Sequence, residues 1–91
     1  MVNIVNEYTL DNGLRVLFVP VLGVPSVSVI SLIKYGGRHE DDDRCGMAHF
    51  YEHLVHDGTE NFPSSKEFSE ILESKGAESN AMTGEEYTGY Y

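Results

Sequence analysis

The sequence predicts an α+β fold in which short strands flank two helices within one small domain. Two observations predict it: a turn signal between two β-prone runs near the start, and two later segments with helical spacing and helix caps. The chain has 91 residues, 41% of them hydrophobic and 23% charged, which is ordinary for a globular domain of modest size. No apolar run approaches the about 18 residues that a membrane span needs, so no membrane partner is predicted.

The first third of the chain predicts three strands. Residues 3–10 and 14–19 form a hairpin, since the Asp-Asn-Gly turn at 11–13 contains residues that tolerate positive φ angles. Residues 26–34 form the third strand, and apolar side chains on both of its faces favour an interior position in a sheet. The Gly-Gly pair at 36–37 ends this strand.

Two helices follow a highly charged loop at residues 38–44. The first is predicted over residues 45–56, with acidic loop residues near its positive end and Gly58 placed to end it in a left-handed conformation. The second opens at the Ser-Ser-Lys-Glu capping pattern of residues 64–67 and ends at Gly76.

The final segment, residues 79–91, alternates weakly and reads as a strand with no closing element after it. The sequence is therefore expected to be the N-terminal part of a single longer domain, truncated before the fold closes. An open strand edge and an uncovered apolar face would favour self-association of the fragment.

Charge and cysteine content restrict the classes of partner and the cellular compartment that the sequence predicts. With 15 acidic and 6 basic side chains the net charge is −9, which disfavours a nucleic-acid partner. Cys45 is the single cysteine, so no internal disulfide is expected. The first seven residues carry no basic stretch and no long apolar run, so no export signal is visible and a cytoplasmic location is predicted.

A group of three residues in the first helix suggests metal chemistry. At about 100° per residue, His53 falls about 40° from His49 and Glu52 falls about 60° to its other side, so all three share one face. Two imidazoles four residues apart can converge on one zinc ion, and Glu52 can move protons as a general base. The same pattern also fits a solvated polar face; the opposite apolar stripe and the preceding strand and loop favour the zinc interpretation.

A third histidine on this face, His56, lies about 10.5 Å along the helix axis from His49. One ion is not easily reached by three side chains over that length. A local hydrogen bond or a packing role is therefore favoured over metal binding for His56.

Several ordered blocks resemble the N-terminal part of the inverted-motif zinc peptidases (pitrilysin, insulin-degrading enzyme and mitochondrial processing peptidase). The blocks are Gly37–Glu40, Gly46–Leu54, Gly58-Thr59, Phe62–Ser64 with Phe68, Asn80–Thr83 and Tyr87–Tyr91. The resemblance implies a two-layer sandwich of a mainly antiparallel sheet with helices on one face. It also implies that longer chains repeat this domain and close around a peptide or protein substrate.

The resemblance assigns roles residue by residue. It implies that His49 and His53 are zinc ligands and that Glu52 is the catalytic base. It implies that Asn80, Ala81, Met82 and Thr83 form an edge strand that pairs with the substrate backbone; without it, a turn and strand entry would be preferred. The family's third ligand, a glutamate on a later helix, would lie beyond residue 91. A second homologous domain or subunit is an implied partner.

The predicted function is therefore that of a zinc metalloendopeptidase, with residues 1–91 alone expected to be inactive. The alternative is a non-catalytic homologue that holds substrate or serves as a scaffold. The intact histidines and glutamate disfavour that alternative. A complete 91-residue metal-binding module is disfavoured by the unclosed final strand.

Overall fold

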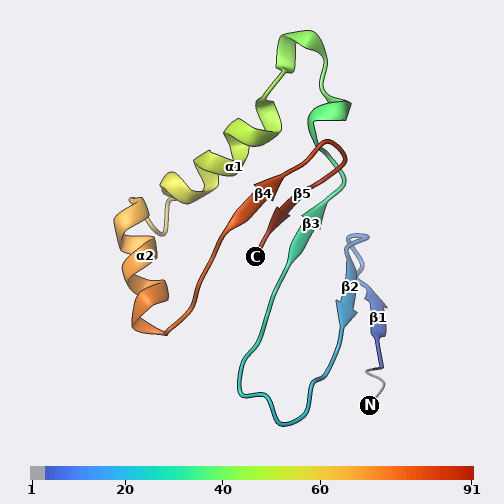
Figure 1. Ribbon diagram of the computed structural model, residues 1–91, viewed down its shortest axis with the longest axis vertical. Coiled ribbons are helices and arrows are strands. Elements are labelled where there is room, and N and C mark those ends of the chain that lie inside the picture. Colours follow the sequence, from blue (N-terminus) through green and yellow to red (C-terminus); the bar gives the residue numbers. More distant parts are fainter. Residues whose placement is uncertain (1–3) are drawn as a thin grey trace.

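The computed structural model describes residues 4–91, which contain five short strands and two α-helices (Figure 1). In chain order they are β1 (Asn6–Thr9), β2 (Arg15–Phe18), β3 (Ser31–Ile33), α1 (Met47–Asp57), α2 (Ser65–Ser74), β4 (Ala81–Thr83) and β5 (Thr88–Tyr90). Two short 3-10 turns, η1 (Gly37–His39) and η2 (Asp42–Arg44), precede α1. The strands form two antiparallel sheets, so the α+β prediction is confirmed.

Strands β1 and β2 form the predicted hairpin. Gly13 takes a φ of +87° in the turn, and the Asn12 side chain accepts a hydrogen bond of 3.0 Å from the Leu14 amide. An exposed ion pair of 2.6 Å joins Arg15 to Glu7, and this hydrogen bond and charge lower the pKa of the Glu7 carboxyl. The strands are shorter than predicted, and residue 3 of the first predicted strand lies outside the described residues.

The second sheet has the strand order β3-β5-β4, so β5 lies between its two antiparallel neighbours. The prediction of an interior strand over residues 26–34 was therefore wrong for the described part of the chain. The strand is confined to Ser31–Ile33 at an edge, and Leu32 remains 65% exposed. Apolar side chains on both faces of a strand indicate that both faces are buried in the complete fold. They do not indicate whether the strand has a hydrogen-bonded neighbour at each edge.

Helix α1 begins two residues later than predicted and ends before Gly58. Gly58 has a φ of +152° and a ψ of 159°, which is an extended conformation rather than the left-handed one predicted. A Cβ atom at this position would lie 2.7 Å from the Pro63 carbonyl oxygen. Glycine is thus required both by the positive φ angle and by the close approach of the next loop.

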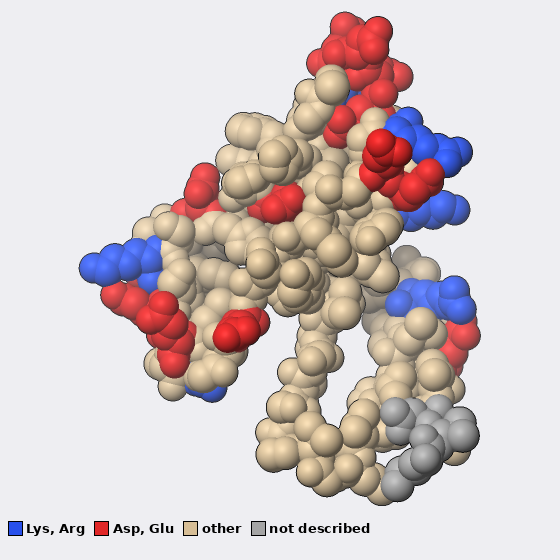
Figure 2. Space-filling model, viewed as in Figure 1, with Lys and Arg blue, Asp and Glu red and all other residues tan. Residues whose placement is uncertain are grey.

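Helix α2 starts as its capping pattern predicts. The Ser64 side chain is the N-cap and accepts a hydrogen bond of 3.2 Å from the Glu67 amide. Acidic side chains gather over α2 and over the loop that carries η1 and η2 (Figure 2). The charged side of α2 is therefore exposed to solvent, while Phe68 and Leu72 on the other side are half-buried.

The packed region lies where α1 meets the three-stranded sheet. Helix α1 runs beside β4 (Figure 1), and Ala48 is the one buried hydrophobic side chain among the described residues. Thr88 of β5 is also buried, and its hydroxyl donates a 2.8 Å hydrogen bond to the Tyr35 carbonyl. This small core joins the helix that carries the candidate site to the sheet. No helix within residues 4–91 has the length and apolar character needed to cross a bilayer.

Candidate metal centre

His49 and His53 lie one turn apart on α1, and both are exposed. Their Nε2 atoms are 3.0 Å apart, and their ring centroids are separated by 4.7 Å with the rings inclined at 69°. The two imidazoles therefore point their outer nitrogens at one place outside the helix. This arrangement follows from the helical period, which sets residues four apart above each other.

The donor geometry fits a tetrahedral zinc ion. Two imidazole nitrogens at about 2.0–2.1 Å from zinc in a tetrahedral site lie about 3.3 Å from each other. The observed separation of 3.0 Å needs to widen by only a few tenths of an ångström to accommodate the ion. Within residues 4–91 no group of three or more His, Cys, Asp or Glu side chains is placed to hold a metal, so this part of the chain offers two donors.

Glu52 precedes His53 in the same helix and is half-buried. Its Oε2 atom accepts a hydrogen bond from the Thr83 hydroxyl of β4. Among residues 4–91 we find no second hydrogen bond to this carboxylate, which leaves Oε1 for another partner. The glutamate is thus oriented by the sheet, whereas the two histidines point into solvent.

A second carboxylate, that of Glu40, fixes the start of α1. Its Oε2 accepts from the Gly46 amide and its Oε1 accepts from the Ala48 amide, each at 2.7 Å. A carboxylate satisfies amides that lack helical partners and also suits the positive end of the helix dipole. The sequence indicated acidic residues near this helix end, but the choice of Glu40 was missed because no local capping pattern spans that distance.

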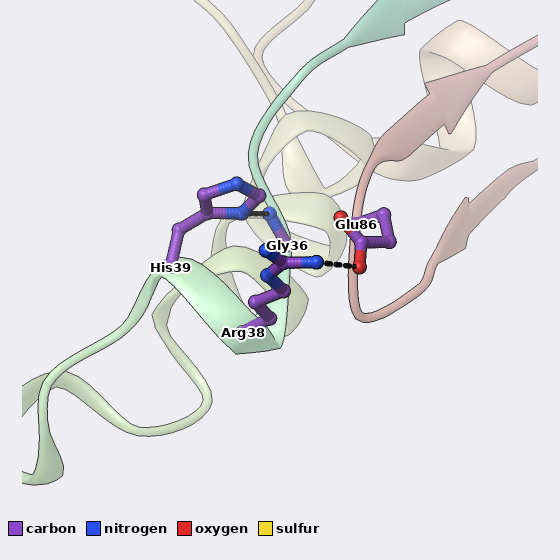
Figure 3. Close-up of polar contacts among 4 residues, drawn as sticks. All are labelled: Gly36, Arg38, His39 and Glu86. Atoms are coloured by element: carbon purple, nitrogen blue, oxygen red, sulfur yellow. Dashed lines mark hydrogen bonds and ion pairs between the residues drawn. The ribbon is translucent and has the colours of Figure 1, made fainter.

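The segment that carries Glu40 is docked on the connection between β4 and β5. The Gly37 amide donates to the Gly84 carbonyl at 3.1 Å, and the Arg38 amide donates to the Glu85 carbonyl at 2.9 Å. The Arg38 guanidinium also pairs with the Glu86 carboxylate (Figure 3). These contacts join the segment ahead of α1 to the hairpin of β4 and β5.

His39 completes this docked segment. Its Nδ1 atom accepts a hydrogen bond of 3.2 Å from the Gly36 amide (Figure 3), and its ring stacks on Tyr35 with centroids 5.8 Å apart. The imidazole therefore has a structural role in the turn and lies outside the pair formed by His49 and His53.

The predicted substrate strand, Asn80–Thr83, lies beside α1. Asn80 exchanges main-chain hydrogen bonds of 2.6 and 2.9 Å with Tyr91, and β4 continues this pairing along β5. Because β4 ends the order β3-β5-β4, its other edge is unpaired within the described residues. An unpaired edge next to the helix of the histidines is a suitable place for an extended peptide to add as a strand.

His56 takes the hydrogen-bonding and packing role that its position along the helix favoured. Its Nδ1–H donates to the Glu52 carbonyl at 3.0 Å. Its ring lies 6.4 Å from the Phe68 ring and 6.5 Å from the Tyr90 ring. Burial raises the pKa of the Tyr90 hydroxyl, and nearby Tyr51 and Glu52 raise it further. His56 thereby links α1 to α2 and to the sheet.

The family model for insulinase (peptidase family M16) matches residues 22–91. The chain belongs to this family. It is 37% identical over 87 residues to the uncharacterized zinc protease YmxG of Bacillus subtilis (strain 168), covering 96% of this chain and 21% of that protein. This assignment confirms the family resemblance seen in the sequence motifs.

Two further relatives have named activities. Insulin-degrading enzyme of Bos taurus is 33% identical over 82 residues, covering 90% of this chain and 8% of the relative. The beta subunit of mitochondrial-processing peptidase of Dictyostelium discoideum is 37% identical over 84 residues, covering 91% of this chain and 18% of the relative. The chain thus spans about a fifth or less of the length of these relatives. The names of the family's proteases associate it with zinc.

Proposed function

We propose that this chain carries the zinc-binding and proton-transferring part of a metalloendopeptidase of the insulinase family. His49 and His53 hold the metal, and Glu52 is the general base. The observation that carries the proposal is the convergence of the two Nε2 atoms to 3.0 Å on the exposed face of α1. Membership of a family whose relatives are named zinc proteases supports the same assignment.

The chemistry follows from these three side chains. Zinc, when bound, acts as a Lewis acid that makes water a usable nucleophile at neutral pH. Glu52 accepts the proton that this water loses as its oxygen bonds to the peptide carbonyl carbon. Glu52 then donates that proton to the amide nitrogen as the carbon–nitrogen bond breaks. His49 and His53 would bind the ion through their Nε2 atoms.

The substrate in this proposal is an extended peptide that pairs with Asn80–Thr83. The edge of β4 that is unpaired within residues 4–91 offers main-chain donors and acceptors at strand spacing, which bind a peptide backbone with little demand on its side chains. Contact between α1 and β4 supports this placement, because it brings the peptide beside the helix of the histidines.

The remaining parts of the site are assigned to the whole protein. Two donors do not complete a catalytic zinc site, which has three protein ligands and an open position. We assign the third to a glutamate outside residues 1–91, and we propose a second homologous domain or subunit as a partner. Relatives of which this chain covers only 21% and 8% are long enough to supply both. Residues 1–91 alone are expected to be inactive.

The test compares Glu52→Gln with His53→Ala in the whole protein. Glu52→Gln should keep its zinc and lose the chemical step by about 10² to 10⁴, because the amide accepts no proton from water. His53→Ala should lose zinc and activity together, since it removes a donor. Zinc content by atomic absorption and peptide hydrolysis are measured on both variants. A Glu52→Gln protein with undiminished hydrolysis would eliminate the mechanism.

A further inference from the structure

We propose that Thr83 is a positioning residue for Glu52, so that its side chain serves the catalytic base while its main chain lies on the substrate strand. This inference rests on the proposed function and adds a residue to it. The Thr83 hydroxyl donates to Glu52 Oε2 across 31 positions of sequence. An ionised carboxylate only accepts hydrogen bonds, so the hydroxyl is the donor in this pair.

The hydroxyl is presented from a fixed frame. Thr83 pairs with Thr88 in the β4–β5 ladder, and the Gly84 amide closes the following turn on the Tyr87 carbonyl at 2.8 Å. Thr88 is buried and is held in turn by the Tyr35 carbonyl. The β-branched side chain of Thr83 has few rotamers of its own, so its hydroxyl has little freedom to move away.

Glu52 needs such a partner because its side chain is flexible. It extends from a helix on three rotatable bonds, and no other hydrogen bond to its carboxylate is found among residues 4–91. The Thr83 hydroxyl holds one oxygen of the carboxylate and leaves Oε1 to take the proton. A base that is held in this way reaches the water in one geometry, and misplacement of a reacting group is costly in rate.

A purely structural tie between β4 and α1 would have other consequences. Loss of such a tie would loosen the packing around Ala48 and lower stability and zinc content along with activity. A direct substrate contact by the hydroxyl would instead raise KM. A positioning role predicts a lower kcat with KM, zinc content and thermal midpoint unchanged.

The kinetic experiment uses Thr83→Val and Thr83→Ser in the whole protein. Thr83→Val should lower kcat about tenfold at constant KM, while Thr83→Ser, which keeps the hydroxyl but loses the β-branch, should retain most of the wild-type value. In a Glu52→Gln background Thr83→Val should cause no further loss, because no base remains to be positioned. The matched control is Thr9→Val, which removes an exposed hydroxyl from β1 and should leave the kinetics unchanged.

A second readout does not depend on activity. Three-bond NMR couplings of isotopically labelled Glu52 in the whole protein should report one side-chain rotamer in the wild type and in Thr83→Ser, and an average over rotamers in Thr83→Val. If Thr83→Val keeps both kcat and the single rotamer, the positioning role is refuted. If the wild-type protein hydrolyses no peptide yet the couplings change as expected, the proposed function fails while the contact between Thr83 and Glu52 is upheld.

Discussion

Glu40 and Glu52 both serve helix α1, but at different points and with different partners. Glu40 binds two amides at the start of the helix, whereas Glu52 faces the Thr83 hydroxyl in the sheet. The helical period predicts that Glu52 shares a face with His49 and His53; the structure places all three on α1, with Glu52 hydrogen-bonded to Thr83 and both histidines exposed. The helical period does not predict that Glu40 binds the first amides of α1 or that Glu52 binds Thr83, because only the folded structure brings these residues together.

Removal of the Glu40 carboxylate should lower the free energy of unfolding by a measurable amount. Glu40→Ala leaves the Gly46 and Ala48 amides without their acceptor and should cost about 1 kcal/mol, or up to about 2, as for the loss of a helix cap. Glu40→Gln keeps one acceptor oxygen and should cost less. Urea denaturation followed by circular dichroism measures both. Glu78→Ala, in an exposed loop, is the control, and equal midpoints for Glu40→Ala and Glu78→Ala would contradict the capping role.

Among the secondary-structure elements, the local signals proved more informative than the pairing signals. The hairpin turn and the Ser64 cap were predicted because each depends on residues close in sequence. The edge position of β3 was not, since strand order depends on which segments meet across the fold. The docking of residues 36–38 on the β4–β5 connection belongs to the same class of contact.

This docking predicts a sharp difference between two adjacent glycines. A Cβ atom at Gly36 would lie 2.3 Å from the Gly84 carbonyl oxygen, whereas one at Gly37 would meet no atom within 4 Å. Gly36→Ala should therefore destabilise the chain by about 1–3 kcal/mol, the range for overpacking, while Gly37→Ala should be close to neutral. Thermal unfolding of the two variants is the measurement. A Gly36→Ala midpoint no lower than that of Gly37→Ala would show that this contact is not maintained.

Across the whole molecule, apolar surface is far more extensive than the core. Ala48 is the one buried hydrophobic side chain among residues 4–91, while Val27 is 89% exposed and Val29 is 72% exposed. The sequence composition predicted a globular domain but could not indicate how much apolar surface would find cover inside residues 1–91. The relative placement of His49, Glu52 and His53 depends less on the size of the core, because all three come from one helix.

The exposed apolar segment at residues 27–30 predicts that residues 1–91 self-associate in solution. Contiguous apolar surface and an unpaired strand edge both favour contacts between copies. The net charge of −9 opposes association, so dimer formation should increase with salt as repulsion is screened. Sedimentation velocity over a range of concentrations should show dimers that Val27→Lys weakens.

Ser28→Lys is the control for this prediction, because it adds the same charge without removing apolar surface and should weaken the dimers less. A monomer at every concentration and salt level would contradict the prediction, and equal effects of the two lysines would assign any association to charge alone.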